Sequence, residues 1–438
     1  MKTKLFLILL LTTSFVFAQN TDYSKLDRLF NSLEEFDKGM GQISIFHDGK
    51  EVYARSYGYA DIANQQKIQH NTKFRVGSVS KTFTATIIMK LIENGKLSLS
   101  TTLNKYYPQI QNADKITIQY LLEHRSGIAN FTSVEDYMKW NTQAHSKEQI
   151  LERIKSGGVI FSPDERFAYS NSNYVLLAWI AEEVSGKTYA QLLEEMIIKP
   201  CALKNTYVGG KINPKNGEAL SYIKLSEWKL EPETDMSIPI GAGFIVSTAT
   251  DLNTFFYCLF NNKLLSMESL ERMKRMKDSF GLGLIEAPFY NKRGYGHTGG
   301  IDGFQSNVFY FPEDKMSVAI NSNAVNYPLN DILVAVLSVY YGREYKLPEF
   351  KNSADISVEQ LDKYAGTYSS STFPLKITIK RDKNTLLAQA TGQPAFPLEF
   401  VKEDIFKFEQ AKLEIEFLPA TNELILRQFG GVYNLKKE

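Results

Sequence analysis

The spacing of apolar and polar residues predicts a mixed α and β structure over most of the chain. Residues 42–60 alternate around Asp48-Gly49, a dipeptide suited to the positive φ angles of a two-residue turn, and so predict a β-hairpin. Residues 78–94 carry one apolar stripe at helical spacing, and Gly95 ends the predicted helix. The pattern then stays mostly helical to about residue 230 and includes a predicted helix over residues 173–184.

Strand patterns return after residue 297. Residues 304–311 and 316–321 predict two strands that are joined by a short turn containing Pro312. The apolar run over residues 332–341 predicts one further helix, which Gly342 ends. A sheet therefore follows the helical region in the sequence.

The last part of the chain has a different pattern of apolar and polar residues. A polar, aperiodic stretch containing Pro348 predicts a linker, which we place at residues 346–353. Beyond it, apolar and polar residues alternate with a period of two, which predicts an all-β domain over residues 354–438. The main domain is accordingly expected to span residues 19–345.

The N-terminus has the three parts of a secretory signal peptide. Two lysines precede an apolar run over residues 5–17, and the small residue Ala18 marks the cleavage position. A transmembrane anchor is the alternative, but the run is interrupted by hydroxyl side chains at residues 12–14 and is shorter than the ~20 residues that span a bilayer. We expect residues 1–18 to be removed and the protein to be exported, periplasmic or extracellular, without a membrane anchor.

Charge and cysteine content exclude some classes of function. Lys and Arg number 50 against 49 Asp and Glu, so no net field favours a nucleic-acid partner. The only cysteines are Cys201 and Cys258, which could pair in an oxidising compartment. Neither has a metal or redox spacing, and we expect two buried, unpaired side chains. Nothing in the sequence indicates an oligomeric state.

A serine and a lysine three residues apart form the first candidate for chemistry. The pattern occurs three times, at Ser78/Lys81, Ser221/Lys224 and Ser226/Lys229. Only Ser78 follows a glycine and opens an apolar-striped helix, where free backbone N–H groups and the helix dipole favour negative charge. The spacing puts Lys81 on the same helix face, where burial would let it take the serine proton. The alternative is a purely structural role, with Ser78 as the N-cap of the helix and Lys81 on the surface.

Tyr169-Ser170-Asn171 is the second candidate. It is the only Tyr-x-Asn among 24 tyrosines and directly precedes the helix predicted from residue 173. A tyrosine hydroxyl near an ammonium group can pass a proton to a leaving group, and an asparagine amide can bind both a substrate carbonyl and the lysine. Taken alone, the triplet is equally compatible with a turn before a helix.

His297-Thr298-Gly299, followed by Gly300, is the third candidate. It lies just before the predicted strand at residues 304–311, and its glycines would let a substrate backbone lie along the strand edge. The backbone N–H of Gly300 would be free to bind an oxyanion. The other match to His-x-Gly, His47-Asp48-Gly49, lies at the tip of the predicted hairpin and is interpreted as a turn.

The three motifs, in this order, resemble those of the serine β-lactamase and penicillin-binding protein superfamily. The most similar branch contains class C β-lactamases, D-alanyl-D-alanine carboxypeptidases, D-aminopeptidases and related esterases. The resemblance covers about residues 25–342 and is carried by five segments: Phe74-Arg75-Val76-Gly77-Ser78, Leu121-Leu122-Glu123-His124-Arg125-Ser126-Gly127, Gly241-Ala242-Gly243, Ser247-Thr248-Ala249-Thr250-Asp251 and Gly296-His297-Thr298-Gly299-Gly300. Residues 361–368 also resemble the start of the small β-barrel appended to many such hydrolases.

The resemblance implies a fold of the α/β class, α+β type. It consists of an antiparallel sheet of five or more strands with helices on both faces, a helical subdomain opposite, and the site between them. A β-barrel-like domain would follow at the C-terminus.

The resemblance also implies roles for individual residues. Ser78 would form the acyl-enzyme, and Lys81 with Tyr169 would handle its proton, either one serving as the base. Asn171 would hold the substrate amide. The backbone N–H groups of Ser78 and Gly300 would form the oxyanion hole.

The His297-Thr298-Gly299 segment would bind substrate in the same scheme. His297 replaces the lysine of class C β-lactamases and resembles the histidine of carboxypeptidase and aminopeptidase members. No cofactor or metal enters this chemistry, and the remaining histidines show no ligand spacing.

Several substrate classes remain open at this level. The first hypothesis is acyl transfer on D-amino-acid peptides of cell-wall type, which His297 favours over a dedicated β-lactamase. The second is an esterase acting on small acyl esters with the same residues. A β-lactam-binding sensor without turnover and a β-lactamase proper are further alternatives. Under all of these hypotheses the partner is a small molecule: a peptide, an amide, an ester or a β-lactam.

Overall fold

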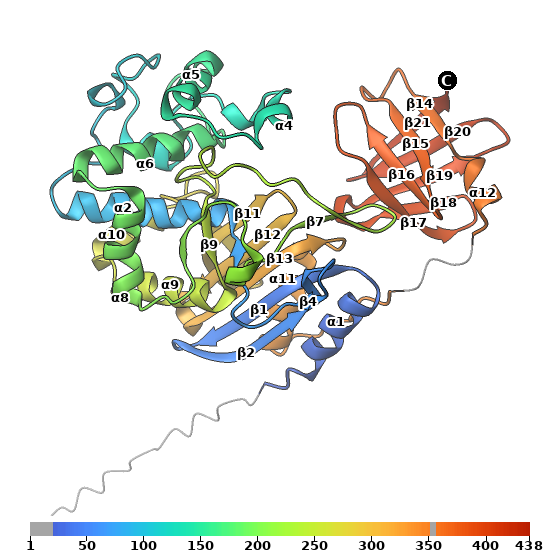
Figure 1. Ribbon diagram of the computed structural model, residues 1–438, viewed down its shortest axis with the longest axis horizontal. Coiled ribbons are helices and arrows are strands. Elements are labelled where there is room, and N and C mark those ends of the chain that lie inside the picture. Colours follow the sequence, from blue (N-terminus) through green and yellow to red (C-terminus); the bar gives the residue numbers. More distant parts are fainter. Residues whose placement is uncertain (1–20, 351–355) are drawn as a thin grey trace, which may run out of the picture.

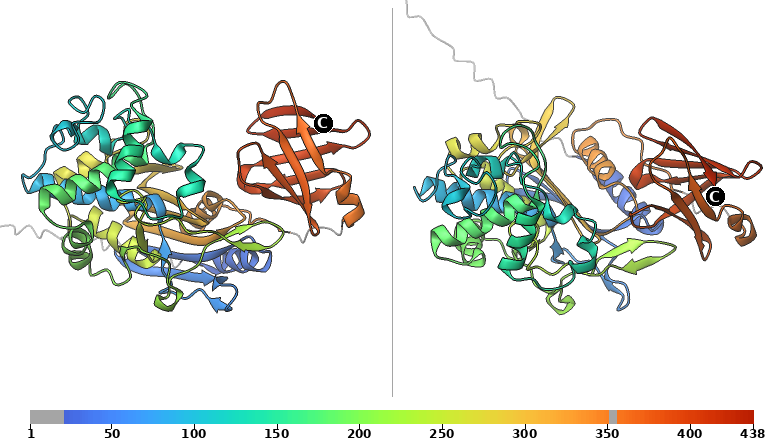
Figure 2. Two further views of the ribbon diagram at one scale, coloured as in Figure 1. Left: turned by 45° about the horizontal axis from the view of Figure 1, so that its top comes forward. Right: turned by 90° about the horizontal axis from the view of Figure 1, so that it is seen from above.

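The computed structural model describes residues 21–350 and 356–438 of the 438-residue chain. The predicted signal peptide and residues 351–353 of the predicted linker lie outside the described residues. A large part made of sheet and helices lies beside a separate β-barrel, and the two meet at one side only (Figure 1 and Figure 2). In the described parts of the chain, every helix is too short or too polar to span a lipid bilayer.

An antiparallel sheet forms the centre of the larger part. Its strands run in the order β10, β11, β12, β13, β1, β2, and a short β7–β8 hairpin joins β13 through one parallel contact. The turn between β1 and β2 contains Asp48 and Gly49, whose φ angles are 48° and 75°, so the predicted hairpin is confirmed. The strands are β1 (Gly39–His47), β2 (Lys50–Tyr57), β7 (Tyr222–Lys224), β8 (Trp228–Leu230), β10 (Ile285–Phe289), β11 (Lys292–Ile301), β12 (Phe304–Phe311) and β13 (Met316–Val325).

Helices cover both faces of this sheet, as expected. Side chains of β12 alternate between them: Val308 and Tyr310 join the core under α9 (Ala249–Phe260), whereas Phe309 and Phe311 join the opposite core. The opposite core is closed by α1 (Ser24–Glu35) and α11 (Leu329–Tyr340). The period-two pattern of the strand therefore fixes which residues face the helical subdomain.

The helical subdomain is built around α2 and α6, which share one large apolar core. The predicted helix 78–94 is present as a short 3-10 turn, Gly77–Val79, followed by α2 (Ser80–Glu93). The predicted helix 173–184 is α6 (Asn171–Ser185), which ends at Gly186 in the left-handed conformation. The other helices here are α3 (Ile118–Leu122), α4 (Tyr137–Trp140), α5 (Lys147–Gly157), α7 (Tyr189–Leu193), α8 (Lys199–Cys201) and α10 (Met267–Met273).

The prediction of a mostly helical pattern to residue 230 is wrong beyond about residue 206. This region holds β6 (Tyr207–Val208), a single 3-10 turn at Pro214–Asn216 and the β7–β8 hairpin, with no α-helix between residues 207 and 230. Strands of two or three residues contain too few positions to show a period of two, so the sequence pattern did not reveal them. The remaining short strands are β3 (Tyr59–Asp61), β4 (Gln66–Lys67), β5 (Phe74–Arg75) and β9 (Ile245–Ser247). Cys201 and Cys258 are both buried and free.

The C-terminal part is a closed eight-stranded barrel, preceded by the short helix α12 (Val358–Asp362). Pairing of Tyr368 with Lys437 closes it by joining the first strand to the last. Apolar side chains from alternate positions fill the interior, as the period-two pattern predicts. The strands are β14 (Gly366–Ser369), β15 (Ile377–Asp382), β16 (Thr385–Ala390), β17 (Phe396–Lys402), β18 (Ile405–Phe408), β19 (Leu413–Leu418), β20 (Glu423–Gln428) and β21 (Gly431–Lys437).

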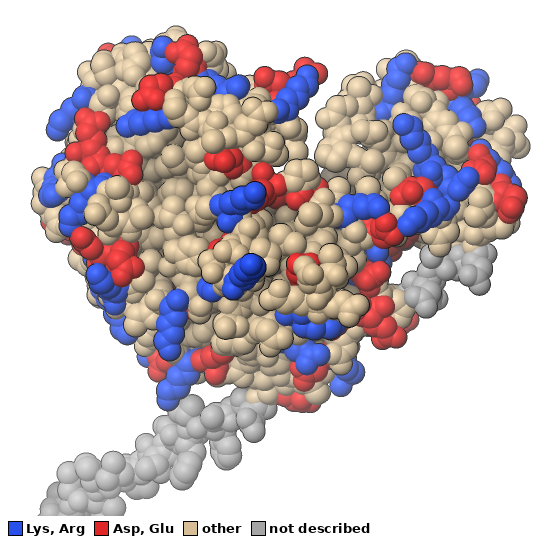
Figure 3. Space-filling model, in the orientation of Figure 1, with Lys and Arg blue, Asp and Glu red and all other residues tan. Residues whose placement is uncertain are grey.

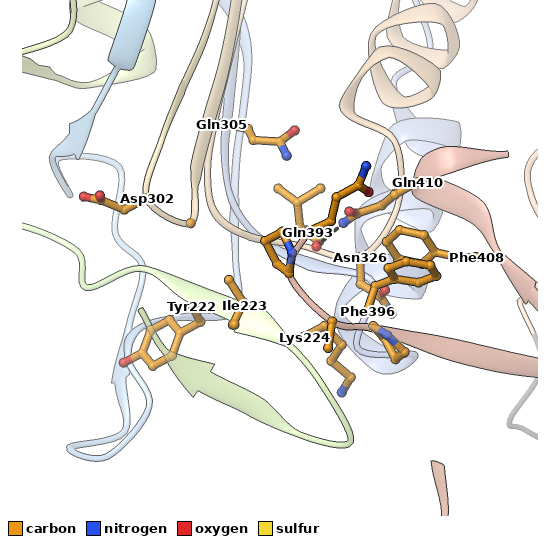
Figure 4. A pocket seen from close by; sticks show the side chains of 15 residues that line it. Tyr222, Ile223, Lys224, Asp302, Gln305, Asn326, Gln393, Phe396, Phe408 and Gln410 are labelled. Carbon is orange, nitrogen blue, oxygen red and sulfur yellow. Dashed lines mark hydrogen bonds between the residues drawn. The ribbon is translucent and has the colours of Figure 1, made fainter. Parts of the chain in front are cut away.

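Polar contacts connect the barrel to the larger part. Lys38 Nζ lies 2.6 Å from Glu399 Oε1, and Lys383 Nζ lies 2.7 Å from Glu227 Oε2. Gln410 donates from its side-chain amide to the backbone carbonyl of β13. A cavity of about 320 Å³ lies at this junction, lined mainly by uncharged side chains from both parts (Figure 4).

The chain segment before the junction packs on the larger part. Leu347 and Phe350, which lie in the predicted linker, contact the core between the sheet, α1 and α11. The ring centroid of Phe350 is 5.1 Å from that of Tyr327 and 6.1 Å from that of Phe36. Residues 347–350 thus extend the core of the larger part.

Two truncations test this arrangement. A chain that ends at Phe350 should fold and stay close to the full-length protein in melting temperature of its main domain, because the apolar contacts of Leu347 and Phe350 remain. A chain that ends at Gly342 should melt roughly 5 °C lower, since full burial of a large apolar side chain contributes about 1.5–3 kcal/mol and the two partly buried side chains each lose a part of it. Calorimetry of the two chains makes the comparison, and equal melting temperatures would contradict a stabilising role for this segment.

Candidate active site

Ser78 lies in a tight turn between a short strand and a long helix. β5 leads into the 3-10 turn, where the backbone N–H of Val76 donates to the carbonyl of Ile245 at 3.0 Å. The N–H of Ile245 in turn donates to Ser80 Oγ at 3.0 Å. Gly77 has a φ angle of +50°, and a Cβ there would lie 2.7 Å from the backbone nitrogen of Gly300. The serine is therefore held at a helix start, where backbone N–H groups have no partner within the helix.

Lys81 is buried, with 0% of its surface exposed, and touches three acceptors. Its Nζ lies 2.9 Å from Ser78 Oγ, 2.8 Å from Asn171 Oδ1 and 2.8 Å from the carbonyl oxygen of Ala242. Burial lowers the pKa of the Lys81 amine well below its usual range. A neutral amine has two N–H groups for the two carbonyl oxygens and one lone pair for the hydroxyl proton of Ser78.

Tyr169 contacts the same serine from the other side. Its hydroxyl donates to Ser78 Oγ at 2.7 Å, and Lys81 Nζ lies 4.8 Å from the centre of its ring. Burial raises the pKa of Tyr169 to about 12, and the hydrogen bond to Ser78 opposes that rise. The Tyr169 hydroxyl is therefore protonated at neutral pH and acts as a donor, whereas Lys81 is the group able to accept a proton.

Asn171 is the first residue of α6 and makes polar contacts with both groups of its side-chain amide. Its Oδ1 accepts from Lys81, and its Nδ2 donates to Thr132 Oγ1 at 2.8 Å. Its backbone N–H donates to Asn130 Oδ1 at 3.0 Å. The expected contact with the lysine is present, and Thr132 takes one of the two N–H groups of the side-chain amide, which leaves the other for a substrate carbonyl.

The strand β11 runs directly against the serine turn. A Cβ at Gly299 would lie 2.0 Å from the carbonyl oxygen of Val76 and 3.1 Å from the backbone nitrogen of Ser78. This close approach brings the backbones of Gly300 and Ser78 together, as an oxyanion site between their N–H groups requires. Glycine at 299 is thus needed for contact between two protein backbones, and not only to leave space for a substrate.

His297 and Thr298 point to opposite faces of the sheet. His297 pairs with Val308 on the face of the helical subdomain, whereas Thr298 pairs with Asn307 on the face of α11. His297 is buried, and its Nδ1–H donates to the carbonyl oxygen of Thr298 at 2.5 Å. Burial, and then the charge of Lys81, lower the pKa of His297 to about 3, so its ring is neutral at physiological pH. Thr298 instead lines a cavity of about 310 Å³ beside Asn330.

Arg75 lies at the centre of an ion-pair network that the sequence pattern did not indicate. The side chain is 2% exposed and lies 2.9 Å from Asp302 and 2.6 Å from Glu233. It also donates to the carbonyl oxygens of Thr234 and Gly210 at 2.9 Å each. Because Arg75 precedes the serine turn and Asp302 follows β11, their ion pair ties the serine turn to the end of β11. A charged residue between Phe74 and Val76 was the only signal in the sequence.

The two other Ser-x-x-Lys patterns lie away from this constellation. Ser226 Oγ donates to Asp382 of the barrel at 2.5 Å, and Lys229 is paired with Glu227 at 2.5 Å. Lys224 is paired with Asp37 at 3.1 Å. Over residues 21–350 and 356–438, no three His, Cys, Asp or Glu side chains gather where they could share a metal ion. Acidic and basic side chains are interspersed over the face shown in Figure 3.

Known proteins share this sequence pattern and fold. The family model described as Beta-lactamase matches residues 33–336. Penicillin-binding protein 4* of Bacillus subtilis (strain 168) is 26% identical over 93% of this chain and 96% of its own length. Teichoic acid D-alanine hydrolase of Staphylococcus aureus (strain MRSA252) is 26% identical over 72% of this chain and 79% of its own.

A solved structure extends the similarity to both parts of the molecule. The octameric penicillin-binding protein homologue from Pyrococcus abyssi has a TM-score of 0.65 and 26% identity, and it covers 95% of this chain and 100% of its own. The family match spans the sheet and the helical subdomain, including all the residues gathered around Ser78. The chain belongs to the Beta-lactamase family and is a serine hydrolase.

Proposed function

We propose that this protein hydrolyses D-amino-acid peptides of the kind that penicillin mimics, through an acyl-enzyme at Ser78. The observation that carries the proposal is the position of Ser78 Oγ, 2.9 Å from Lys81 Nζ and 2.7 Å from the Tyr169 hydroxyl. The similarity to a penicillin-binding protein and to a teichoic acid D-alanine hydrolase supports a D-amino-acid substrate. We also propose that the protein is exported and acts on a small molecule or the end of a longer one.

In the first step, the neutral Lys81 amine takes the Ser78 hydroxyl proton while Oγ attacks the substrate carbonyl carbon. The negative charge that develops on the carbonyl oxygen is stabilised by the backbone N–H groups of Ser78 and Gly300. The proton is then on Lys81, whose ammonium group is held by Asn171 and the carbonyl of Ala242. The family comparison leaves open whether Lys81 or Tyr169 is the base, and the two pKa shifts favour Lys81.

Collapse of the tetrahedral intermediate requires a proton on the leaving amine. In the proposed step, Tyr169 gives its hydroxyl proton to that amine, and the Lys81 ammonium group, 4.8 Å from the centre of the Tyr169 ring, returns a proton to the phenolate. Water then attacks the acyl-enzyme with Lys81 again as base, which releases the acid and restores Ser78. Each cycle breaks one amide bond and consumes one water.

His297 supports a peptide substrate over a dedicated β-lactamase. Class C β-lactamases carry a lysine at the matching position, whereas the His297 ring is neutral because of its burial. Its Nδ1–H is held by the backbone, which leaves the Nε2 lone pair as the group that can accept a hydrogen bond. An amide N–H group of a peptide substrate can donate to such an acceptor.

An esterase acting on small acyl esters is the second candidate, because the same residues suffice and the leaving oxygen of an ester depends less on protonation than the leaving nitrogen of an amide. A panel separates the candidates: a D-alanyl-D-alanine peptide, a D-amino-acid amide, a nitrophenyl ester and a chromogenic cephalosporin. Preference for the peptide or amide supports the proposal. Preference for the ester, with no turnover of the peptide or amide, would assign the protein to the esterases.

The nucleophile is tested with a labelled penicillin. Wild-type protein should form a covalent adduct on the peptide containing Val76 to Lys81, because Oγ of Ser78 opens the β-lactam ring as it would attack a peptide. Ser78→Ala should give no adduct and lose about 10³-fold or more in turnover, since removing one member of a linked catalytic unit removes most of its effect. Mass spectrometry locates the adduct, and retention of a tenth of the wild-type rate in Ser78→Ala would refute the assignment.

The base is tested by comparing three lysines that share the same sequence pattern. Lys81→Ala should reduce kcat nearly as much as loss of the serine, because the other group that contacts Ser78 Oγ, the Tyr169 hydroxyl, is protonated and donates to it. Lys224→Ala and Lys229→Ala are matched controls, since both side chains are paired with carboxylates away from Ser78. They should keep kcat within about twofold of wild type, as surface ion pairs contribute ~0–1 kcal/mol. Inactivation by either control would show that the wrong serine has been chosen.

The pH dependence follows from the directions of the pKa shifts. Lys81 is active as the free amine, so kcat/KM should rise with pH through the lowered pKa of Lys81 and then stay level. His297, at about 3, and Tyr169, at about 12, titrate outside the working range of about pH 5 to 9. A stopped-flow profile of acylation should therefore show one acidic limb, which His297→Asn retains. A basic limb inside this range would contradict the assignment of Tyr169 as a neutral donor.

A further inference from the structure

His124 is a buried histidine that the proposed chemistry does not use. It follows α3 in the loop that leads toward α4, and 1% of its surface is exposed. Its φ angle is +56°, a left-handed backbone conformation that residues other than glycine seldom adopt. A strained backbone conformation of this kind persists only where the contacts around the residue hold it in place.

The contacts of His124 are with the backbone before Tyr169, the backbone after it and the Tyr169 ring. The backbone carbonyl of His124 accepts from the N–H of Ala168 at 2.9 Å, and its Nδ1 accepts from the N–H of Ser170 at 3.1 Å. The His124 ring lies against the Tyr169 ring, with 4.3 Å between the centroids. One residue thus binds the backbone on both sides of the tyrosine and packs on the tyrosine itself.

The protonation state of His124 follows from these partners. A backbone N–H can only donate, so Nδ1 carries a lone pair and the neutral ring carries its proton on Nε2. Burial, followed by the charges of Lys81 and His297, lowers the pKa of His124 well below its usual range. The acceptor at Nδ1 is therefore present throughout the working pH range.

Tyr169 depends on such external support because its own segment is irregular. Residues 167–170 belong to no helix or strand, and α6 begins only at Asn171. The neighbours of His124 bind the same region: Arg125 pairs with Asp164 at 2.6 Å, and Ser126 Oγ donates to Asn173 Oδ1 at 2.7 Å. The loop over residues 124–126 therefore holds both ends of the segment that presents the tyrosine.

We propose that His124 is a positioning residue, which fixes the Tyr169 hydroxyl at hydrogen-bond distance from Ser78 through its Nδ1, its backbone carbonyl and its ring. The inference rests on the proposed function, because it assigns His124 a role through Tyr169. The alternative is that His124 only fills the aromatic cluster that it forms with Tyr174 and Phe280, at centroid distances of 5.1 and 5.9 Å.

A double-mutant cycle on kcat, with the D-alanyl-D-alanine peptide as substrate, distinguishes the two roles. His124→Phe keeps an aromatic ring and removes the Nδ1 acceptor. It should lower kcat by about 10- to 100-fold with KM nearly unchanged, since displacement of a reacting group by ~1 Å can cost 10²-fold. In a Tyr169→Phe background the same change should lower kcat by less than about threefold, because residues that act through one another are not additive.

Two further variants control for packing. His124→Gln supplies a carbonyl oxygen that can accept from Ser170 N–H, and it should recover much of the lost kcat even if its melting temperature is low. Tyr174→Phe removes the 2.8 Å hydrogen bond to the carbonyl of Leu122, next to the same loop, and should lower stability while kcat stays within about twofold.

The outcomes distinguish failure of the positioning role of His124 from failure of the proposed catalytic function. Non-additivity together with rescue by glutamine supports the positioning role. Equal losses from His124→Phe in both backgrounds, or a kcat within twofold of wild type, would overturn it while leaving Ser78 and Lys81 in place. A fully active Tyr169→Phe would instead overturn the proposed role of the tyrosine, and the positioning role with it.

Discussion

The removal of one lysine from water is the constraint on which the site depends. Transfer of a charged amine into a low-dielectric interior is costly, and a buried lysine meets that cost by losing its proton. Lys81 can be buried at all because Asn171 and Ala242 supply oxygens for its N–H groups. The fold therefore creates a base from a side chain that is ordinarily an acid. That result requires α2, α6 and the segment around residue 242 to converge, and they do so within a single apolar core.

The second constraint is the close approach of two backbones. The serine turn and β11 come from opposite ends of the main domain, and glycine at positions 77 and 299 permits the contact. A close contact alone does not fix the geometry of two N–H groups. The buried pair of Arg75 and Asp302 lies just outside the contact, one residue in each of the two segments, and truncation of either partner would leave an uncompensated charge. The ion pair and the two glycines thus together determine how closely the serine turn approaches β11.

The sequence was informative where local spacing determines geometry. A separation of three residues at a helix start was sufficient to place Lys81 beside Ser78, and the period of two was sufficient for the hairpin and the barrel. It was not sufficient for the face on which Thr298 lies, because that depends on its register with β12. The contribution of His124 was also missed, since it depends on a positive φ angle and on a partner segment more than 40 residues away. Its only signal was a histidine between an apolar run and Ser126-Gly127.

The junction with the barrel follows a different physical rule from the site. Its contacts include pairs such as Lys383 with Glu227, both about half exposed, and pairs of this kind contribute ~0–1 kcal/mol each. The segment around Phe350, by contrast, is attached through apolar contacts to the core of the larger part. The junction with the barrel thus includes weak, salt-sensitive pairs, whereas the contacts among Ser78, Lys81 and Tyr169 are buried. Ionic strength can therefore alter the junction while the proton-transfer groups keep their geometry, because the latter are shielded from solvent by the same burial that sets their pKa values.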